Sequence, residues 1–524
     1  MKQFKKLTMP IIAVLLLSVL LLPGCTKVED NTDIGENDSV AENETPVAET
    51  NDETETISTQ VVVVGSGATG LSASIEARQQ GLDVIMLEKN AFTGGTTNTA
   101  EGYGGLNSNY AEKQGIHYDV REVFFAAQEF HHWATDQDII MKLYENSGEG
   151  ANWLESLGVE FEVLAPNGNN KYNTWHIYKG TGAQFVKTLT NKAEESGVQI
   201  MLNTTGKELI MEDGKVAGIK ATKGDGGNLV INAPVVILAT GGYAGSPEMI
   251  EKYAKMDADD VYDTGIAGRT GDGINMALAV GASDRRLNGS LMNFGSAMKP
   301  YGVYEPVNLL GWLPVLKVNE HGNRFVDESL MNEDWGTNGN AQRQQGTIYM
   351  IMSKQNLDNF AENGLPGFGG ETPDFYGEIE GALKDHPDYV FVADSIDDLA
   401  EKTNIDKEQL KATIERYNGF AKTGIDLDYG KDAEFLYPVE EGPYYALRFE
   451  LGIFATTDGL VVTPDAQVVD KEGNIIPGLY AGGSDAGGLN GETYEVSIVP
   501  GAQQAWAVNS GRFAVQDAVR YLNK

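Results

Sequence analysis

Short apolar runs alternate with longer mixed segments along the first part of the chain, as strands alternate with helices. Val61–Val64 is an unbroken β-branched run, which predicts a buried parallel strand. A helix-like segment then extends to Gln80, and Gly81 is placed to end it. Leu82–Leu87 is a second apolar run and predicts the next strand. The order strand, helix, strand predicts a parallel sheet of the α/β class.

The turn between the first predicted strand and helix carries Gly65, Gly67 and Gly70 at G-x-G-x-x-G spacing. The first glycine permits a tight turn, the second lets a pyrophosphate approach the backbone, and the third lets helix and strand pack closely. Glu88 follows the second strand, where an acid hydrogen-bonds to ribose hydroxyls. Because glycines, strands and acid occur together, this segment predicts a dinucleotide site.

Similar patterns continue beyond this unit. A glycine-rich stretch at Phe92–Gly105 would let backbone come close to a flat or phosphorylated ligand. Further strands are predicted at Gln199–Asn203, Val216–Thr222 and Val235–Ala239, and a final helix rich in small residues at Gly501–Leu522. A second G-x-G-x-x-G with its own acid does not occur, which disfavours a reductase that binds both FAD and NAD.

The N-terminal segment indicates secretion. Residues 1–24 place lysines before an apolar stretch too short for a confident membrane span, which predicts a signal peptide. The segment ends in Leu22-Pro23-Gly24-Cys25 and resembles a bacterial lipoprotein box, with a stray cysteine after an ordinary signal as the alternative. Cys25 is therefore expected to be lipidated, and the protein to be extracytoplasmic and held at the cell membrane by lipid alone. Residues 25–59, acidic and polar, predict a disordered tether.

Composition excludes several classes of function. The 524 residues carry a formal charge of −37, which argues against nucleic acid as a partner. A single cysteine excludes internal disulfides, thiolate-held iron–sulfur clusters and C-x-x-C-H haem attachment. His131 and His132 are adjacent, so they point to different sides of a helix and predict structural roles; no metal site is expected.

A series of motifs resembles the fumarate reductase/succinate dehydrogenase-like flavoproteins, a family with urocanate reductases and ketosteroid dehydrogenases. The series runs from residue 61 to residue 521 and includes VVVVGSGATGLSASIEA, LEKNAFTGGTTNTAEGYGG, ILATGGY, TGDGINMALAVGA, VNEHGNRFVDE, TTDGLVVTPDAQVVD and IPGLYAGG. The resemblance implies FAD and a discontinuous Rossmann-like FAD-binding domain of α/β class, formed by residues 60–285 and 441–524. It also implies an inserted α+β capping domain at residues 286–440.

The same resemblance assigns residues to the cofactor. Gly65, Ser66, Gly67 and Gly70 would hold the pyrophosphate, and Glu88 the adenosine ribose. The helix that follows Gly501 would direct its N-terminus at the flavin ring and stabilise negative charge there. Ser484 is a departure, because relatives carry an acid at this position. The other residues expected along FAD are Gly95, Thr96, Thr97, Thr240, Gly241, Asp272, Gly483, Ser497 and Ile498.

The residues that grip two carboxylates in fumarate reductases are missing. Ala455 replaces the histidine of the family, Tyr494 replaces the arginine of the loop at the flavin, and Asn332 replaces a relay arginine. Residues 353–357, where the catalytic arginine is expected, read SKQNL. Arginine suits carboxylates because its planar fork makes two charge-assisted bonds. Neither fumarate nor urocanate is therefore the expected substrate.

The remaining candidates for chemistry are acids and aromatic residues. Tyr494 could donate a hydrogen bond to a carbonyl or a proton to carbon, and a packing tyrosine is an equal alternative. Glu328 is the acid that survives from the proton relay of the family. Arg343 could reach the pocket from the capping domain, but a solvated helix position is favoured. Three further acids that burial could adapt to acid–base roles are Glu492, Glu495 and Asp334. Four aromatic residues that suit a flat substrate, or the core, are Tyr301, Tyr304, Trp312 and Trp335.

Together these features predict an FAD-dependent oxidoreductase that reduces an activated C=C bond of an organic electron acceptor other than fumarate. Flavin N5 would supply hydride and a side chain the proton, with electrons from a separate membrane-associated or flavin- or haem-carrying donor. One alternative is ketosteroid-dehydrogenase-like oxidation of a ketone-bearing ring compound. The other is a flavin-carrying redox lipoprotein without its own substrate, against which the capping domain argues.

Overall fold

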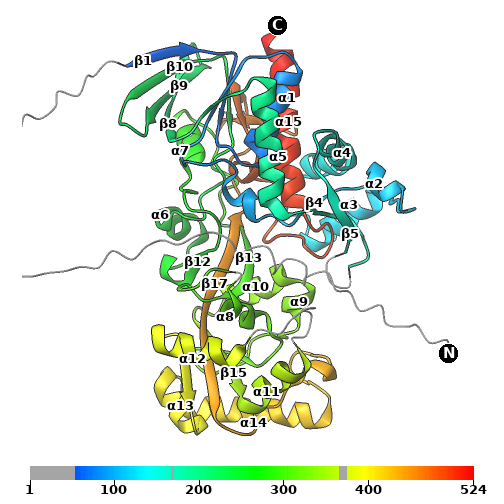
Figure 1. The fold of residues 1–524 in the computed structure, drawn as a ribbon, viewed down its shortest axis with the longest axis vertical. Helices are drawn as coiled ribbons and strands as arrows, with labels where there is room; N and C mark the ends of the chain where they lie inside the picture. Colours follow the sequence, from blue (N-terminus) through cyan, green and yellow to red (C-terminus); the bar gives the residue numbers. More distant parts are fainter. Residues whose placement is uncertain (1–53, 167–169, 304, 365–373, 524) are drawn as a thin grey trace, which may run out of the picture.

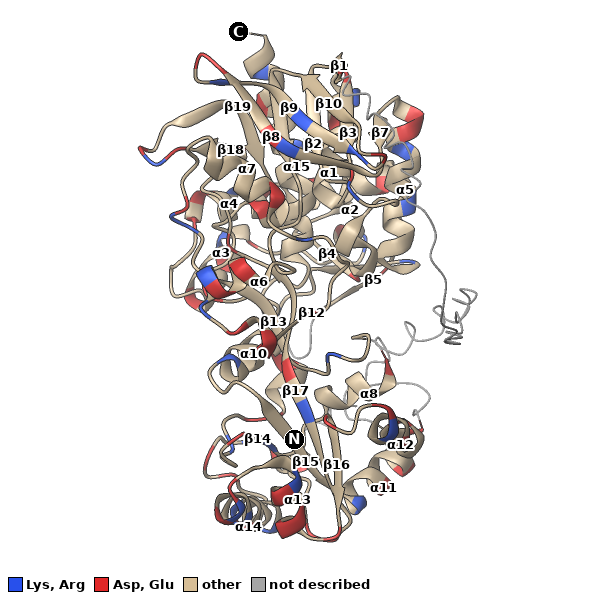
Figure 2. Ribbon diagram, turned by 90° about the vertical axis from the view of Figure 1, so that its left-hand side faces the viewer, with Lys and Arg blue, Asp and Glu red and all other residues tan. Residues whose placement is uncertain are grey.

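The computed structural model describes residues 54–166, 170–303, 305–364 and 374–523. The predicted signal peptide, Cys25 and most of the tether lie outside these ranges. The described chain forms an elongated molecule of two units (Figure 1). Acidic and basic residues are spread over both units (Figure 2). In the described part of the chain, no helix combines the length and apolar character needed to cross a bilayer.

A six-stranded sheet forms the centre of the upper unit, in the order β18-β19-β11-β2-β3-β7. The four valines of β2 are buried, and β2 pairs in parallel with β3 and β11. This arrangement confirms the predicted α/β unit. The strands are β2 (Val61–Val64), β3 (Val84–Leu87), β7 (Gln199–Met201), β11 (Val235–Leu238), β18 (Gln467–Val469) and β19 (Ile475–Ala481).

Helices α1 (Ala68–Gln79), α5 (Thr181–Ser196) and α15 (Ala502–Leu522) lie side by side on this sheet (Figure 1). A Cβ at Gly511 would lie 2.4 Å from the carbonyl oxygen of Thr69. Glycine at this position therefore lets α15 approach α1 closely, as the small residues of the predicted final helix indicate.

A four-stranded sheet, β1-β10-β9-β8, covers the outer side of the upper unit. Its strand β1 (Glu55–Ser58) corrects the sequence interpretation, because these residues were assigned to the tether. β1 pairs in parallel with β10, and the backbone bonds of this pairing compensate for its polar composition. The other strands are β8 (Thr204–Glu212), β9 (Lys215–Lys223) and β10 (Asn228–Asn232).

The lower unit is a cap built on one long strand, β17 (Tyr444–Thr456). β17 pairs with four other strands of the cap sheet, although it lies in the stretch assigned to the second part of the FAD-binding domain. The two units therefore share this strand. The cap strands besides β17 are β12 (Val261–Asp263), β13 (Leu291–Ala297), β14 (Lys317–Asn319), β15 (Ile348–Ser353) and β16 (Val390–Ala393).

The remaining elements surround these sheets. A small sheet in the upper unit contains β4 (Gly102–Gly104), β5 (Phe161–Ala165) and β6 (Trp175–Tyr178). The remaining helices of the upper unit are α2 (Asn109–Glu112), α3 (Val120–Phe130), α4 (Gln137–Ser156), α6 (Pro247–Met249) and α7 (Asp272–Ala279). Those of the cap are α8 (Pro306–Leu309), α9 (Leu330–Glu333), α10 (Trp335–Arg343), α11 (Lys354–Asn363), α12 (Phe375–Asp385), α13 (Ile396–Thr403) and α14 (Lys407–Thr423).

Candidate active site

The turn between β2 and α1 is built for glycine. Gly65 has φ +104°, and a Cβ there would lie 2.2 Å from the carbonyl oxygen of Ala239. A Cβ at Gly70 would lie 1.9 Å from the carbonyl oxygen of Gly65, whereas one at Gly67 meets nothing closer than 3.6 Å. α1 begins after Gly67 without a side-chain cap. The turn thus leaves room and N–H groups for a phosphate at the helix N-terminus.

Glu88 lies beside this turn, as expected. Its Oε2 accepts hydrogen bonds from Ser66 N at 3.0 Å and Ser66 Oγ at 2.6 Å, and its Oε1 accepts one from Asn90 N at 2.8 Å. Oε1 keeps an acceptor site for a ribose hydroxyl, whereas Ser66 occupies both acceptor sites of Oε2. Asp272 pairs with Lys89 at 2.6 Å, next to the acid. The structure therefore brings these predicted cofactor residues together.

The loop after β3 closes over the same helix terminus. Thr97 Oγ1 accepts a hydrogen bond from Ala68 N at 3.0 Å, and Thr96 Oγ1 accepts one from Ile266 N at 3.2 Å. Gly95 has φ +47° and no atom within 4 Å of an added Cβ. This open backbone lies beside the glycine turn, because Gly94 N donates to Ser66 O at 3.0 Å.

Asp485 is a site residue that sequence reasoning missed. Its carboxylate is fully buried and accepts hydrogen bonds from Thr240 N at 2.5 Å and Gly242 N at 2.9 Å. Burial raises the pKa of Asp485. The acid that Ser484 lacks is thus present one residue later, where it ties the turn at Thr240, Gly241 and Gly242 to the turn at Gly483. Its position directly after Ser484 was the available signal.

Tyr494 lies at the N-terminus of α15. The phenol oxygen accepts a hydrogen bond from Gly501 N at 2.5 Å, and α15 has no side-chain cap. Burial raises the pKa of Tyr494, although N–H groups in the first turn of α15 oppose this change. The hydroxyl is therefore protonated at neutral pH, and the bond from Gly501 leaves its hydrogen free to donate. Gly104 N donates to Gly501 O at 3.0 Å, so the glycine-rich stretch also reaches this point.

Five aromatic side chains form a line from Tyr494 into the cap. Trp335 begins α10 and lies against Tyr494 and Phe454, with ring centroids 5.3 and 5.7 Å away. Phe294 contacts Phe454 at 4.5 Å and stacks on Trp312 at 5.7 Å. Trp335, Phe454 and Trp312 are partly exposed. We call these five residues the aromatic box. The box joins Phe454, directly before Ala455, to the Tyr494 loop, so two of the places where the sequence departs from the family pattern meet.

Polar contacts next to the box join the two units. Ser497 Oγ donates to Asp334 Oδ2 at 2.9 Å, and Asp334 Oδ1 accepts a hydrogen bond from Thr337 N at 3.0 Å. Asp334 is therefore a cap of α10, in place of the acid–base role considered from the sequence. Ile498 O accepts a hydrogen bond from Asn170 Nδ2 at 3.0 Å. Ser497 and Ile498 thus lie at the junction with the cap.

Glu328 has a structural role in place of the expected acid–base role. It is fully buried in the cap, where Arg324 binds both carboxylate oxygens at 2.9 Å and Lys431 Nζ lies at 2.9 Å. The pKa of Glu328 is lowered because these two cations outweigh burial. An ionised carboxylate held by two cations has no proton to deliver.

The structure also shows the surroundings of the other catalytic and aromatic candidates named from the sequence. Glu492 is exposed, whereas Glu495 is buried against His131 and Tyr144. Arg343 is half-buried and donates to Ala254 O at 2.9 Å, which corrects the expected solvated position. Tyr301 packs on His386 in the cap, and Tyr304 lies outside the described residues.

Asp458 is a second buried acid that the sequence did not single out. Its Oδ2 accepts hydrogen bonds from Tyr243 Oη at 2.8 Å, Asn288 N at 2.9 Å and Gly289 N at 2.7 Å. Burial raises the pKa of Asp458 to about 6. Asn288 and Gly289 precede β13 and Asp458 follows β17, so the acid fastens together two of the segments that connect the units.

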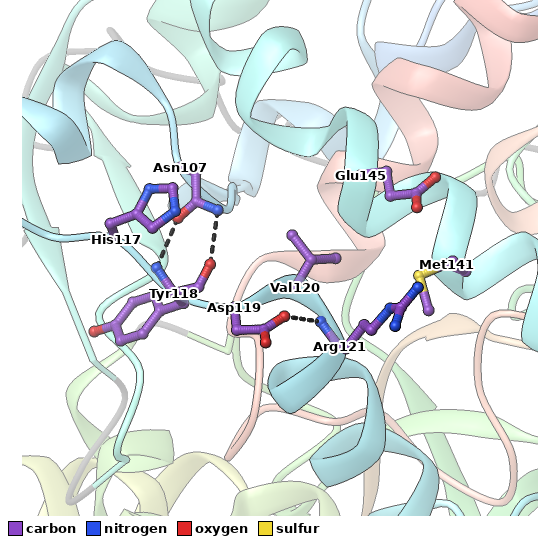
Figure 3. Close-up of a pocket in the computed structure, with 8 residues that line it drawn as sticks. All are labelled: Asn107, His117, Tyr118, Asp119, Val120, Arg121, Met141 and Glu145. Carbon is purple, nitrogen blue, oxygen red and sulfur yellow. Dashed lines mark hydrogen bonds between the residues drawn. The ribbon is translucent and has the colours of Figure 1, made fainter.

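A surface pocket between α3 and α4 is separate from these residues (Figure 3). Asn107 and Tyr118 exchange hydrogen bonds at its edge, and Asp119 Oδ1 accepts one from Arg121 N at the start of α3. None of the predicted site residues lines it. Among the described residues, no group of three His, Cys, Asp or Glu side chains could hold a metal ion.

Comparison with known proteins identifies the ligand of the glycine turn. A family model described as FAD binding domain matches residues 60–496. The chain is 34% identical over 481 residues to the vinyl phenol reductase of Lactiplantibacillus plantarum, covering 88% of this chain and 97% of that one. It is 30% identical over 476 residues to a probable fumarate reductase of Shewanella frigidimarina, covering 88% and 75% of the two chains.

A solved structure agrees with these relatives. The open conformation of a flavocytochrome c3 fumarate reductase aligns with a TM-score of 0.68 and 27% identity, covering 89% of this chain and 79% of that one. The residues present fit FAD, because Gly67 and Gly95 leave open backbone, α1 begins at a glycine without a capping side chain, and Glu88 faces the turn.

Proposed function

Because this chain belongs to the FAD binding domain family and is an FAD-dependent oxidoreductase of the fumarate-reductase-like kind, we propose that it reduces the C=C bond of an uncharged aromatic compound. A vinyl phenol is the type of acceptor we infer, since the relative from Lactiplantibacillus plantarum carries that name.

The aromatic box is the observation that carries this proposal. Trp335 and Phe454 are partly exposed, and the Trp335 ring lies against the ring of Tyr494. Aromatic rings pair with a flat apolar ligand through burial of area and offset stacking. Ala455, next to Phe454, removes the polar head that a histidine would present to a carboxylate. A styrene-like acceptor satisfies such a surface, whereas a dicarboxylate would lose its hydration without gaining a cation.

The ion pair of Arg269 supports the same conclusion. Arg269 pairs with Asp263, and its guanidinium also donates to the Phe454 carbonyl. A cation that already has an ion-pair partner is a poor receptor for a substrate carboxylate. Arg343 donates to Ala254 O, and burial lowers its pKa.

The residues of this chain divide the work of reduction. FAD supplies hydride from N5 when it is bound. The glycine turn, Glu88 and the N-terminus of α1 hold the cofactor, and Trp335 with Phe454 orients the aromatic ring and excludes water. Tyr494 delivers its hydroxyl proton to the carbon next to the one that receives hydride, so the alkene gains two hydrogens. N–H groups of α15 stabilise the phenolate that remains.

The proposal also includes the electron donor and the cellular location of the protein. A separate membrane-associated, flavin- or haem-carrying protein supplies electrons, because the single cysteine leaves this chain without thiolate-held clusters. Lipidation at Cys25 anchors the protein outside the cytoplasm. A Cys25→Ser variant expressed in a bacterium with lipoprotein processing is expected to leave the membrane fraction. Retention of this variant at the membrane would contradict the anchor.

Flavin reoxidation tests the acceptor. The FAD-loaded protein is reduced without oxygen and mixed with vinyl phenol, a hydroxycinnamate, fumarate or a ring enone. The hydroxycinnamate is the matched control, because it adds a carboxylate to the same aromatic alkene. We expect vinyl phenol to reoxidise the flavin at least about 100-fold faster than fumarate. Faster reoxidation by fumarate would overturn the proposal. Reaction with the ring enone alone would favour ketone-bearing ring compounds, whose carbonyl Tyr494 could polarise.

A further inference from the structure

Next to Tyr494, a buried carboxylate is gripped from two helices. We propose that His131, Tyr144 and Glu495 form a clamp that positions Tyr494 for proton delivery. The catalytic consequence of the clamp rests on the role of Tyr494 proposed above. The clamp itself is a statement about packing and hydrogen bonding that can be tested without turnover.

The clamp joins three segments that are distant in the sequence. Tyr144 Oη, from α4, donates to Glu495 Oε1 at 2.5 Å. His131 Nε2, at the end of α3, lies 3.1 Å from Glu495 Oε2. Gly491 N donates to His131 Nδ1 at 3.2 Å, so the histidine holds both ends of the segment from Gly491 to Glu495. Tyr494 lies within this held segment.

Protonation states follow from these partners. His131 Nδ1 accepts a hydrogen bond from Gly491 N. The ring hydrogen is therefore on Nε2, where it donates to Glu495. Burial raises the pKa of Tyr144, and the neighbouring charge of Glu495 raises it further, so the phenol stays protonated as a donor. Each oxygen of the Glu495 carboxylate therefore has its own donor.

Burial makes the clamp rigid. Glu495 is 0% exposed, and His131 is 3% exposed. If the Glu495 carboxylate moved away from Tyr144 and His131, it would lose its charge-assisted hydrogen bonds and remain buried as an unpaired charge. The segment therefore has one strongly preferred placement. Neighbouring side chains face opposite ways here: Glu495 faces α3 and α4, whereas the Tyr494 ring faces Trp335 and α15. Fixing one side chain thus fixes the direction of the other.

Hydrogen–deuterium exchange on the FAD-loaded full chain tests the clamp directly. Tyr144→Phe removes one hydroxyl and is expected to speed amide exchange in the segment from Gly491 to Glu495 by about tenfold. Tyr110→Phe is the matched control, because the Tyr110 hydroxyl bonds only the Glu162 carbonyl near the surface. Unchanged protection in Tyr144→Phe would overturn the clamp. His131→Leu, which removes both ring nitrogens, is the second variant and is expected to act in the same direction.

A double-mutant cycle tests whether the clamp acts through Tyr494. Tyr144→Phe is expected to lower kcat about tenfold, with KM and the FAD dissociation constant within about twofold of wild type. Because the clamp acts by placing Tyr494, adding Tyr144→Phe to Tyr494→Phe should cause no further loss of kcat. Multiplicative losses would overturn positioning.

Rescue and control variants complete the test. His131→Gln keeps one acceptor and one donor and should restore most of the kcat that His131→Leu loses, while His132→Gln changes an exposed neighbour and should leave kcat unchanged. No rescue by glutamine would contradict the hydrogen-bonding role. Full turnover in Tyr494→Phe would refute the proposed proton donor, but the exchange experiment would still decide whether the clamp exists.

Discussion

The glycine turn, which fits FAD, and the aromatic box, which we propose for the acceptor, are built from different parts of the chain. The turn uses backbone, and its three glycines lie within six residues of one another, from Gly65 to Gly70. The box uses side chains from β13, the 3-10 turn Leu310–Trp312, α10, β17 and the Tyr494 loop, which come together only in the folded chain. A site made of backbone requires particular residues at neighbouring positions, so it leaves a local sequence pattern. A site made of packed rings depends on tertiary contacts between distant residues and leaves no local pattern.

The largest expected effect is at Gly65. In Gly65→Ala, strain at φ +104° costs about 1–3 kcal/mol and the contact with the Ala239 carbonyl about 1–3 kcal/mol more. We expect loss of FAD and a melting temperature lower by about 2–6 °C, because a chain of this length unfolds with an entropy of about 1 kcal/mol per degree. Gly81→Ala is the matched control, because Gly81 also has positive φ but nothing within 4 Å of an added Cβ. Equal losses in both variants would show that the close approach to Ala239 is unimportant.

Tyr494→Phe tests the chemistry at the boundary between the two regions. Removal of a general acid costs roughly 10²–10⁴-fold in rate, so kcat for a vinyl phenol should fall at least about 100-fold. FAD content and melting temperature should stay close to wild type, since the ring keeps its contact with Trp335. A variant with wild-type kcat would remove Tyr494 from proton transfer and leave it as a packing residue.

The glycine turn and the aromatic box also show how much of the site the sequence could predict. Val61–Val64, the glycines and Glu88 were placed correctly because each strand, turn and acid has a local pattern. β1 was missed because its four residues are polar and become a strand only through pairing with β10. The box was only partly foreseen: Trp312 and Trp335 were considered, but nothing local connects them to Phe294 or Phe454.

Asp485 and Glu328 show the same limit for charged residues. Alignment to a family pattern found the missing acid at Ser484 but could not show that the next residue turns inward to Thr240. Glu328 fits the motif that contains the proton relay of the family, yet its partners Arg324 and Lys431 make it a fixed anion. The role of a carboxylate is set by its neighbours in space, and those of Glu328 include a lysine about 100 residues away in the sequence.

Asp458 should make stability at the connection between the two units depend on pH, because it fastens two of the segments that connect them. Its pKa is raised from 3.8 in the unfolded chain to about 6 in the folded state. Protonated Asp458 therefore contributes stability below pH 4, and this contribution is lost as pH rises through 6. The shift corresponds to about 3 kcal/mol at most. Relative to Asp458→Asn, wild type should lose stability between pH 4 and 7, as measured by urea unfolding.

Asp213→Asn, at an exposed turn, is the control for this measurement, and its difference from wild type should stay flat over the same pH range. A flat difference for Asp458→Asn as well would mean that the folded carboxyl titrates as in the unfolded chain. A rising difference would reverse the sign that burial predicts.

The smallest effect isolates the box from the cofactor. Trp335→Leu keeps apolar volume but removes the ring that faces Tyr494 and Phe454, a contact worth about 0.5–1.5 kcal/mol beyond area. KM for vinyl phenol should rise about threefold to tenfold, while the FAD dissociation constant stays unchanged. Trp133→Leu, at an exposed tryptophan, is the control and should leave both constants unchanged. If Trp335→Leu instead weakens FAD binding and leaves KM unchanged, the ring contributes to cofactor binding. The aromatic box and the glycine turn would then both belong to the FAD site.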